Sequence, residues 1–134
     1  MSMHVRLRLG DEEYAFPVES VSEVVAVGAL SPVPGAPPSV LGIRNLRGRI
    51  LPVFDLAAVL GVRGDAGRMR VVVAGEEHRS VGFAVDGVSD VCELAEPTEE
   101  THSPYLRGAV LAEGALIGVV DVEGVLVGLG EGES

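Results

Sequence analysis

The side chains that could act as nucleophiles, metal ligands or general bases are few and widely separated. The candidates are His4, His78, His102 and Cys92. None of them has a partner at the sequence spacing typical of metal ligands or of a nucleophile and its base. Solvent-exposed histidines are therefore favoured over metal or catalytic roles. Cys92 lies in a strand-like pattern without a basic neighbour in sequence to lower its pKa, which favours a small core residue over a reactive thiol.

Two aspartates, Asp55 and Asp121, resemble a carboxylate pair that could do acid/base chemistry. Each directly precedes a short apolar run of helical character, at matching places in a repeat described below. An aspartate at that position accepts backbone N–H bonds from the first helical turn, so helix capping is favoured over catalysis. All ten basic residues are arginine, which excludes a phosphate-loop lysine and a Schiff base, and the sequence predicts no active site, metal or cofactor.

The stretch that must position the remaining charged candidates is Gly42–Leu56, reading GIRNLRGRILPVFDL. Two apolar runs flank Arg47 and Gly48, a pair suited to a tight hairpin turn in which the glycine takes positive φ. A short helix, Leu56–Leu60, then follows Asp55. Arg47 is either a solvated cation at a hairpin tip or a contact for a partner, and composition alone does not separate the two.

Composition favours an all-β protein built from short strands. The 134 residues are 47% hydrophobic but only 4% aromatic, with 18 glycines and 8 prolines, so the core must be aliphatic and turns frequent. The formal net charge of −10 disfavours nucleic acid and anionic membrane surfaces as partners. No signal peptide or membrane helix is expected, and one cysteine fits a reducing compartment.

An internal duplication organises the chain as one domain over 1–134, with pseudo-repeats at about 4–60 and 69–126. The segment VESVSEV in the first repeat matches VDGVSDV in the second, and the turn glycine Gly48 matches Gly114. A hinge is expected at 61–67 and a frayed tail at 127–134. We predict two small five-stranded antiparallel barrels with short capping helices, and leave open whether terminal strands cross between them.

The repeats differ in the charge at their hairpin tips. Arg47 in the first repeat aligns with Glu113 in the second, so one scaffold carries a cation at one tip and an anion at the other. Opposite charges at equivalent sites indicate two surfaces for two different partners, as a hypothesis from position alone.

Three segments together resemble the CheW family of chemotaxis coupling proteins: AP-x-x-VLGIRNLRGRILPVFDL, VGFAVDGVSDV and YLRGAVLAEGALIGVVDVEGVL. The resemblance extends over about His4–Leu126. It implies intertwined barrels of Src-homology-3-like topology, no catalysis, and an adaptor that links methyl-accepting chemoreceptors to the histidine kinase CheA. The implied partners are the receptors' cytoplasmic tips and the kinase's regulatory domain. The implied location is the cytoplasm, with recruitment to membrane receptor arrays and no direct membrane insertion; weak self-association is left open.

The resemblance also implies roles for individual residues. Receptor contact is expected at Glu23, Arg47, Val88 and Val91, and kinase contact at Val21 and Gly42. Arg44 departs from the family pattern, which usually has an apolar or small polar residue there.

Two other functions remain open. One is a CheW-like scaffold in a chemosensory pathway that controls twitching, development or a second messenger in place of swimming. The other is a small-ligand-binding barrel, which would show a polar pocket with perturbed titratable groups.

Overall fold

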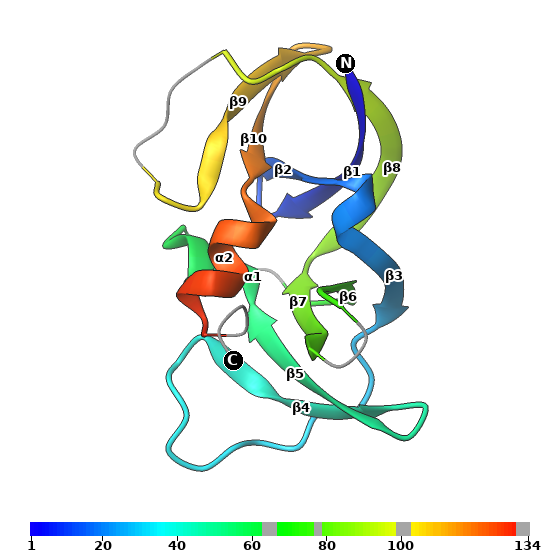
Figure 1. Cartoon of the computed structure of the whole chain (residues 1–134), viewed down its shortest axis with the longest axis vertical. Helices are drawn as coiled ribbons and strands as arrows, with labels where there is room; N and C mark the ends of the chain where they lie inside the picture. The colour runs from blue at the N-terminus through cyan, green and yellow to red at the C-terminus, as the bar shows by residue number, and fades with distance from the viewer. Residues whose placement is uncertain (63–66, 77–78, 99–102, 131–134) are drawn as a thin grey trace.

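The structure, a computed structural model, describes residues 1–62, 67–76, 79–98 and 103–130 (Figure 1). Most of the predicted hinge at 61–67, together with His78, His102 and the end of the tail, lies outside the described residues. Ten strands, one 3-10 turn and two short helices follow in order: β1 Ser2–Leu9, β2 Glu12–Pro17, η1 Val18–Ser20, β3 Val21–Ala26, β4 Val40–Leu46, β5 Arg49–Asp55, α1 Leu56–Leu60, β6 Arg70–Ala74, β7 Val81–Val85, β8 Gly87–Leu94, β9 Leu106–Ala112, β10 Ala115–Val120 and α2 Val122–Gly128. No helix in these ranges is long and apolar enough to cross a membrane.

The strands form two five-stranded sheets, which confirms the all-β class. Sheet A has the order β8-β1-β2-β10-β9, and sheet B has the order β3-β6-β7-β5-β4. Two details of the predicted closed antiparallel barrels need correction. Each sheet contains one parallel pair, β2 with β10 and β5 with β7, and in the described ranges the two end strands of each sheet share no hydrogen-bonded ladder.

The sheets do not follow the sequence repeats. Strands β1 and β2 come from the first repeat but lie between β8 and β10 of the second, while β6 and β7 of the second repeat complete sheet B. The terminal strands therefore cross over, and each sheet takes two central strands from the other repeat. Figure 1 shows sheet A in the upper half of the molecule and sheet B in the lower half.

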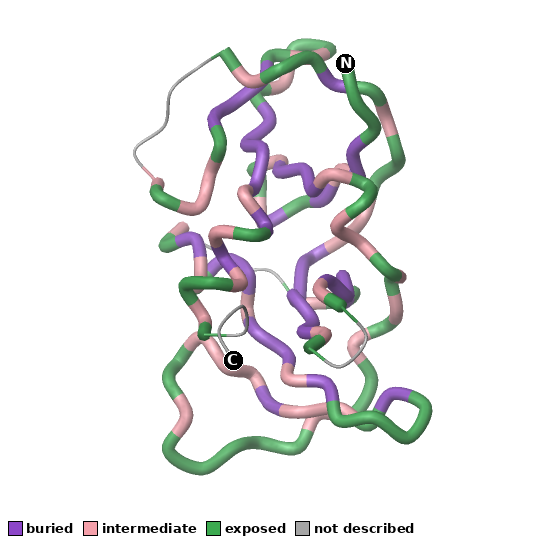
Figure 2. Tube along the Cα trace, viewed as in Figure 1, coloured by how far each residue is buried: buried purple, intermediate pink, exposed green. Residues whose placement is uncertain are grey.

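Apolar side chains form three buried clusters, one of which joins the two sheets. The largest lies between the sheets and includes the buried faces of α1 and α2, through Leu56, Leu60 and Val125. Its centre contains Phe16 and Phe83, repeat-equivalent residues whose rings meet edge to face at 5.7 Å. A smaller cluster lies within each sheet, and Figure 2 shows the buried segments concentrated on these strands. The aliphatic core predicted from composition is confirmed.

The two predicted hairpin turns are confirmed by their backbone angles. Arg47 and Gly48 have φ of 52° and 84°, and Glu113 and Gly114 have 50° and 79°. Two consecutive positive φ angles suit the right-handed twist of the flanking strands, and glycine at the second position avoids a Cβ clash. Asn45 Oδ1 accepts a hydrogen bond from the Gly48 amide at 2.9 Å and so stabilises the first turn.

Of the two predicted aspartate caps, one forms as predicted and the other does not. Asp121 caps α2, because its carboxylate accepts a hydrogen bond from the Gly124 amide at 3.0 Å. Asp55 stands at the N-cap of α1 but makes no side-chain capping bond. Its Oδ1 instead accepts from Arg68 Nε at 2.8 Å, since a guanidinium is a stronger partner for a carboxylate than an amide. The predicted tail begins inside α2, which ends at Gly128.

Candidate functional site

The Arg47 guanidinium at the β4–β5 tip donates to the carboxylate of Glu23 on β3. The family resemblance implies that both residues contact a receptor, and the structure brings them together. The Arg47 side chain is 64% exposed and that of Glu23 is 30% exposed, so the pair is open to a partner on its outer side. Because β3 and β4 are the two end strands of sheet B, this ion pair links its opposite edges.

Other contacts join the same two edges. The Arg44 guanidinium donates to the backbone carbonyl of Ala26 at the end of β3, which gives this departure from the family pattern a structural role. Farther along β4, Ile43 exchanges backbone hydrogen bonds of 2.8 and 2.9 Å with Ser31 in the loop after β3. Sheet B is thus held nearly closed by side chains and one backbone bridge.

Gly42 lies beneath this loop. It has φ of 153°, and a Cβ there would stand 2.6 Å from the Ser31 carbonyl oxygen, so only glycine allows the loop to approach. Val21, the other residue assigned to the kinase, pairs with Ala74, whereas Gly42 pairs with Val53. The two residues therefore lie on opposite end strands of sheet B.

Val88 and Val91 lie on β8 in sheet A, away from the Glu23–Arg47 pair in sequence and in sheet. Val88 is half-buried against the central cluster, while Val91 is 52% exposed. Figure 1 places β8 and β3 along the same margin of the molecule. The four residues predicted to contact a receptor thus fall into a charged group on sheet B and an apolar group on sheet A.

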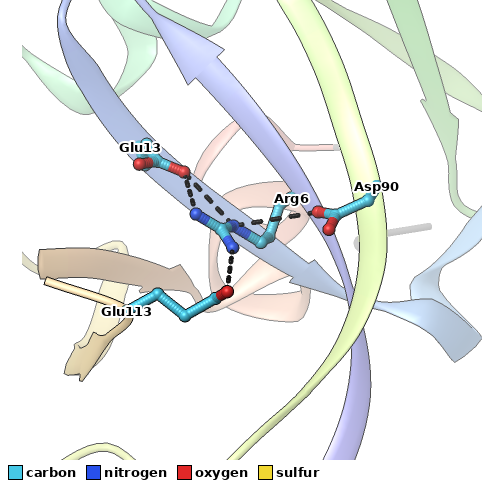
Figure 3. Close-up of polar contacts among 4 residues, drawn as sticks. All are labelled: Arg6, Glu13, Asp90 and Glu113. Atoms are coloured by element: carbon cyan, nitrogen blue, oxygen red, sulfur yellow. Dashed lines mark hydrogen bonds and ion pairs between the residues drawn. The ribbon is translucent and has the colours of Figure 1, made fainter. Parts of the chain in front are cut away.

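Sheet A contains a charged cluster that sequence reasoning missed. Arg6 Nη2 lies 2.5 Å from Glu13 Oε1, Nη1 lies 3.1 Å from Glu113 Oε1, and Nε lies 3.8 Å from Asp90 Oδ1 (Figure 3). The Arg6 side chain is only 12% exposed. Its pKa is raised chiefly by the hydrogen bond to Glu13, so it stays charged. This Arg6 cluster joins β1, β2, β8 and the β9–β10 tip.

The signal for the Arg6 cluster was present in β1. In this strand His4, Arg6 and Arg8 alternate with Val5, Leu7 and Leu9, so the polar residues share one face. His4 is instead buried, and it pairs with Cys92, which packs against the sheet A cluster. The prediction of an exposed His4 is wrong: His4 and Val5, on opposite faces of β1, are both buried, so both faces of the strand are covered here.

Cys92 lies partly buried against the sheet A cluster, as predicted for a small core residue. Burial raises the pKa of its thiol, and the Asp90 carboxylate adds to that effect, while Arg6 opposes it. A thiol with a raised pKa is a poor nucleophile at neutral pH.

Asp55 and Asp121 make different contacts, since Asp121 caps α2 and Asp55 binds Arg68. Asp55 shares Arg68 with the buried Asp86, whose Oδ1 accepts from Arg68 Nη1 at 2.7 Å. These hydrogen bonds raise the pKa of Arg68, with that from Asp55 contributing most. In the described parts of the chain no three His, Cys, Asp or Glu side chains gather as metal ligands would.

The protein is a β-sheet scaffold. It presents paired charges at the sheet tips and exposed valines on the end strands as surface groups for binding. The chain belongs to the CheW-like family, a family of chemotaxis adaptor proteins: the CheW-like domain model matches residues 4–129. The chain is 34% identical over 131 residues to Chemotaxis protein CheW of Rhizobium meliloti (strain 1021), covering 90% of this chain and 84% of that protein. It is also 34% identical over 120 residues to Protein FrzA of Myxococcus xanthus, covering 87% of this chain and 72% of that protein.

A solved structure supports the same assignment. The crystal structure of the scaffolding protein TtCheW from Thermoanaerobacter tengcongensis matches with a TM-score of 0.76 at 26% identity. The match covers 89% of this chain and 88% of that one. The family predicted from the three sequence segments is thereby confirmed.

Proposed function

We propose that this protein is a non-catalytic adaptor that couples methyl-accepting chemoreceptors to the histidine kinase CheA through separate binding surfaces. The observation that carries this proposal is the ion pair between Glu23 and Arg47, because it holds an exposed cation in one orientation at a hairpin tip. A preorganised charge loses less conformational freedom on binding than a free arginine would. Membership of the CheW-like family supplies the kind of partner.

The proposed receptor surface combines Arg47 and Glu23 with Val91 and the exposed part of the Val88 side chain. A receptor tip is helical in this family, and a helix can place an acidic side chain near Arg47 while its apolar face covers an exposed valine. Val24 occupies in β3 the position that Val91 occupies in β8, and both are exposed, so each sheet presents an apolar side chain at this position.

The proposed kinase surface includes Val21 and the segment around Gly42. Gly42 has no side chain to offer and its backbone is covered by Ser31, so we assign it a shaping role. The kinase would then contact the loop that Gly42 allows to settle on β4. Binding to a receptor and to the kinase would recruit the protein from the cytoplasm to membrane receptor arrays.

Two binding experiments test this function. Purified protein is mixed with the cognate kinase regulatory domain in a pull-down, and with receptor-containing membranes in a co-sedimentation assay. The proposal expects binding in both assays and formation of a ternary complex when all three components are present. Binding to neither partner, by protein that is folded by circular dichroism, would refute it.

A further inference from the structure

A pocket of about 390 Å³ opens on the surface of sheet A, between β2 and the β9–β10 hairpin. Its lining combines three consecutive acidic residues, one just before β2 and two at its start, with apolar groups from the hairpin, among them Leu116. The Glu23–Arg47 pair lies on sheet B, and β8, which carries Val88 and Val91, is the far end strand of sheet A. None of these residues lines the pocket, so it is distinct from the proposed receptor contact.

The floor of the pocket is shaped by Tyr14 and Gly118, which lie opposite each other on the parallel strands β2 and β10. A Cβ on Gly118 would stand 2.9 Å from Tyr14 Cδ1, so glycine is needed for the ring to lie against β10. The Tyr14 hydroxyl donates to Glu12 Oε1 at 2.8 Å. Burial, aided by Glu12, raises the pKa of Tyr14, so the phenol remains a neutral donor that orients this carboxylate.

The charged side chains that line the pocket are all acidic. Asp11, Glu12 and Glu13 line it, and no arginine does. Glu13 is engaged by Arg6, which leaves Asp11 and Glu12 as the exposed carboxylates on the rim. Since the whole chain carries a formal charge of −10, the surrounding field also favours a cation.

The apolar part of the pocket continues beyond it. Leu116 is 59% exposed and pairs across the hairpin with Leu111, which is more exposed still. Large exposed aliphatic side chains beside a concave site are typical of surfaces that bind another protein. An aliphatic stem could cover Leu116 while its charged end reaches Asp11 and Glu12, a combination that arginine and lysine provide.

We propose that this pocket binds an arginine or lysine side chain of a partner protein, with the carboxylates of Asp11 and Glu12 receiving the cation and Leu116 contacting the aliphatic stem. The proposal does not depend on which receptor or kinase the protein serves. It assigns a use to the acidic strand β2 and to the exposed leucines, none of which the Glu23–Arg47 surface employs.

The test uses the full chain labelled with ¹⁵N and the peptide acetyl-Leu-Arg-Leu-amide as probe. A matched peptide carries citrulline in place of arginine, which keeps the shape and removes the charge. We expect the arginine peptide to shift the amide resonances of Tyr14, Leu116 and Gly118, and the citrulline peptide to bind at least about five-fold more weakly.

Variants then locate the binding. Asp11→Asn combined with Glu12→Gln should weaken the arginine peptide about five-fold, whereas Glu19→Gln, an exposed carboxylate on η1, should leave binding unchanged. Leu116→Ala, which leaves both carboxylates in place, should weaken both peptides. If the double variant fails to fold, Asp11→Asn alone and Leu116→Ala provide the same comparison.

Three outcomes would overturn the proposal. The first is equal binding of the arginine and citrulline peptides. The second is arginine-peptide shifts confined to residues away from Tyr14, Leu116 and Gly118. The third is a response of these resonances to calcium chloride or spermidine but not to the arginine peptide, which would indicate a site for small free cations.

Discussion

Arg6 of β1 occupies in sheet A the register position that Val73 of β6 occupies in sheet B. Arg6 pairs across the sheet with Asp90, and Val73 pairs with Glu23. In sheet B the hairpin tip supplies a cation for the acid of β3, but in sheet A the tip is acidic too, and the cation comes from within the sheet. The two repeats thus neutralise the equivalent acidic residues, Glu23 and Asp90, with arginines from different positions in the scaffold.

Replacing Arg6 with valine should destabilise the protein, because Glu13, Asp90 and Glu113 would lose their shared cation. We expect the free energy of unfolding in urea to fall by about 1–3 kcal/mol, since Arg6 is mostly buried but its partners are partly exposed. The double variant Arg6→Val with Glu113→Arg recreates the arrangement of sheet B. It should recover at least half of the loss, and a double variant no more stable than the single one would contradict this electrostatic account.

The change Arg47→Glu should separate binding from stability. The Glu23–Arg47 pair is largely exposed, so we expect the free energy of unfolding to change by less than about 1 kcal/mol while co-sedimentation with receptor membranes weakens. A large drop in melting temperature with binding retained would exclude Arg47 as a contact.

A charge exchange provides the control for that variant. Glu23→Arg combined with Arg47→Glu keeps an ion pair at the same place but reverses its direction. If the receptor contacts the Arg47 cation itself, binding stays weak in the exchanged protein. Full recovery of binding would instead mean that only closure of the sheet edge matters.

Gly42→Ala should disturb the loop that crosses β4. The new Cβ would meet the Ser31 carbonyl at 2.6 Å, and the φ of 153° is unfavourable for alanine, so a loss of about 1–3 kcal/mol in unfolding free energy is expected. Gly67→Ala is the matched control, because nothing lies within 4 Å of its Cβ position. Kinase pull-down should weaken for Gly42→Ala only, and equal behaviour of the two variants would remove the shaping role of Gly42.

The thiol of Cys92 should react slowly with a disulfide reagent at pH 8 and faster as the pH rises past its ordinary pKa of 9.0. Because the folded-state pKa is raised above the unfolded one, its contribution to stability is complete below the unfolded pKa and is lost as pH rises through the folded pKa. The protein should therefore lose stability in this alkaline range, and Cys92→Ser should lose less. Equal alkaline loss in both proteins would contradict the shift.

Local patterns predicted the all-β class and both hairpin turns. The short helix Leu56–Leu60 and the duplicated tips appeared where alternation, turn residues and the repeat agreed. These features depend on neighbours within a few residues, and a single sequence contains that information.

What the sequence did not reveal depends on contacts between distant segments. Alternation separates the two faces of β1 but does not say which face meets water, so neither the burial of His4 nor the carboxylates around Arg6 follow from it. Asp55 was assigned to the nearest amides because its true partner, Arg68, is 13 residues away. Likewise, the repeat predicted two equal units but not which strands each unit would share.

The crossing of β1 and β2 into sheet A constrains how such a chain can be divided. Strands β8 and β10 of the second repeat are not neighbours, because both strands between them come from the first repeat. The reverse holds for sheet B, where β6 and β7 separate β3 from β5. A polypeptide consisting of one repeat could therefore complete a sheet only by exchanging its first two strands with a second copy. Gene duplication and fusion would convert that domain-swapped homodimer into this single chain.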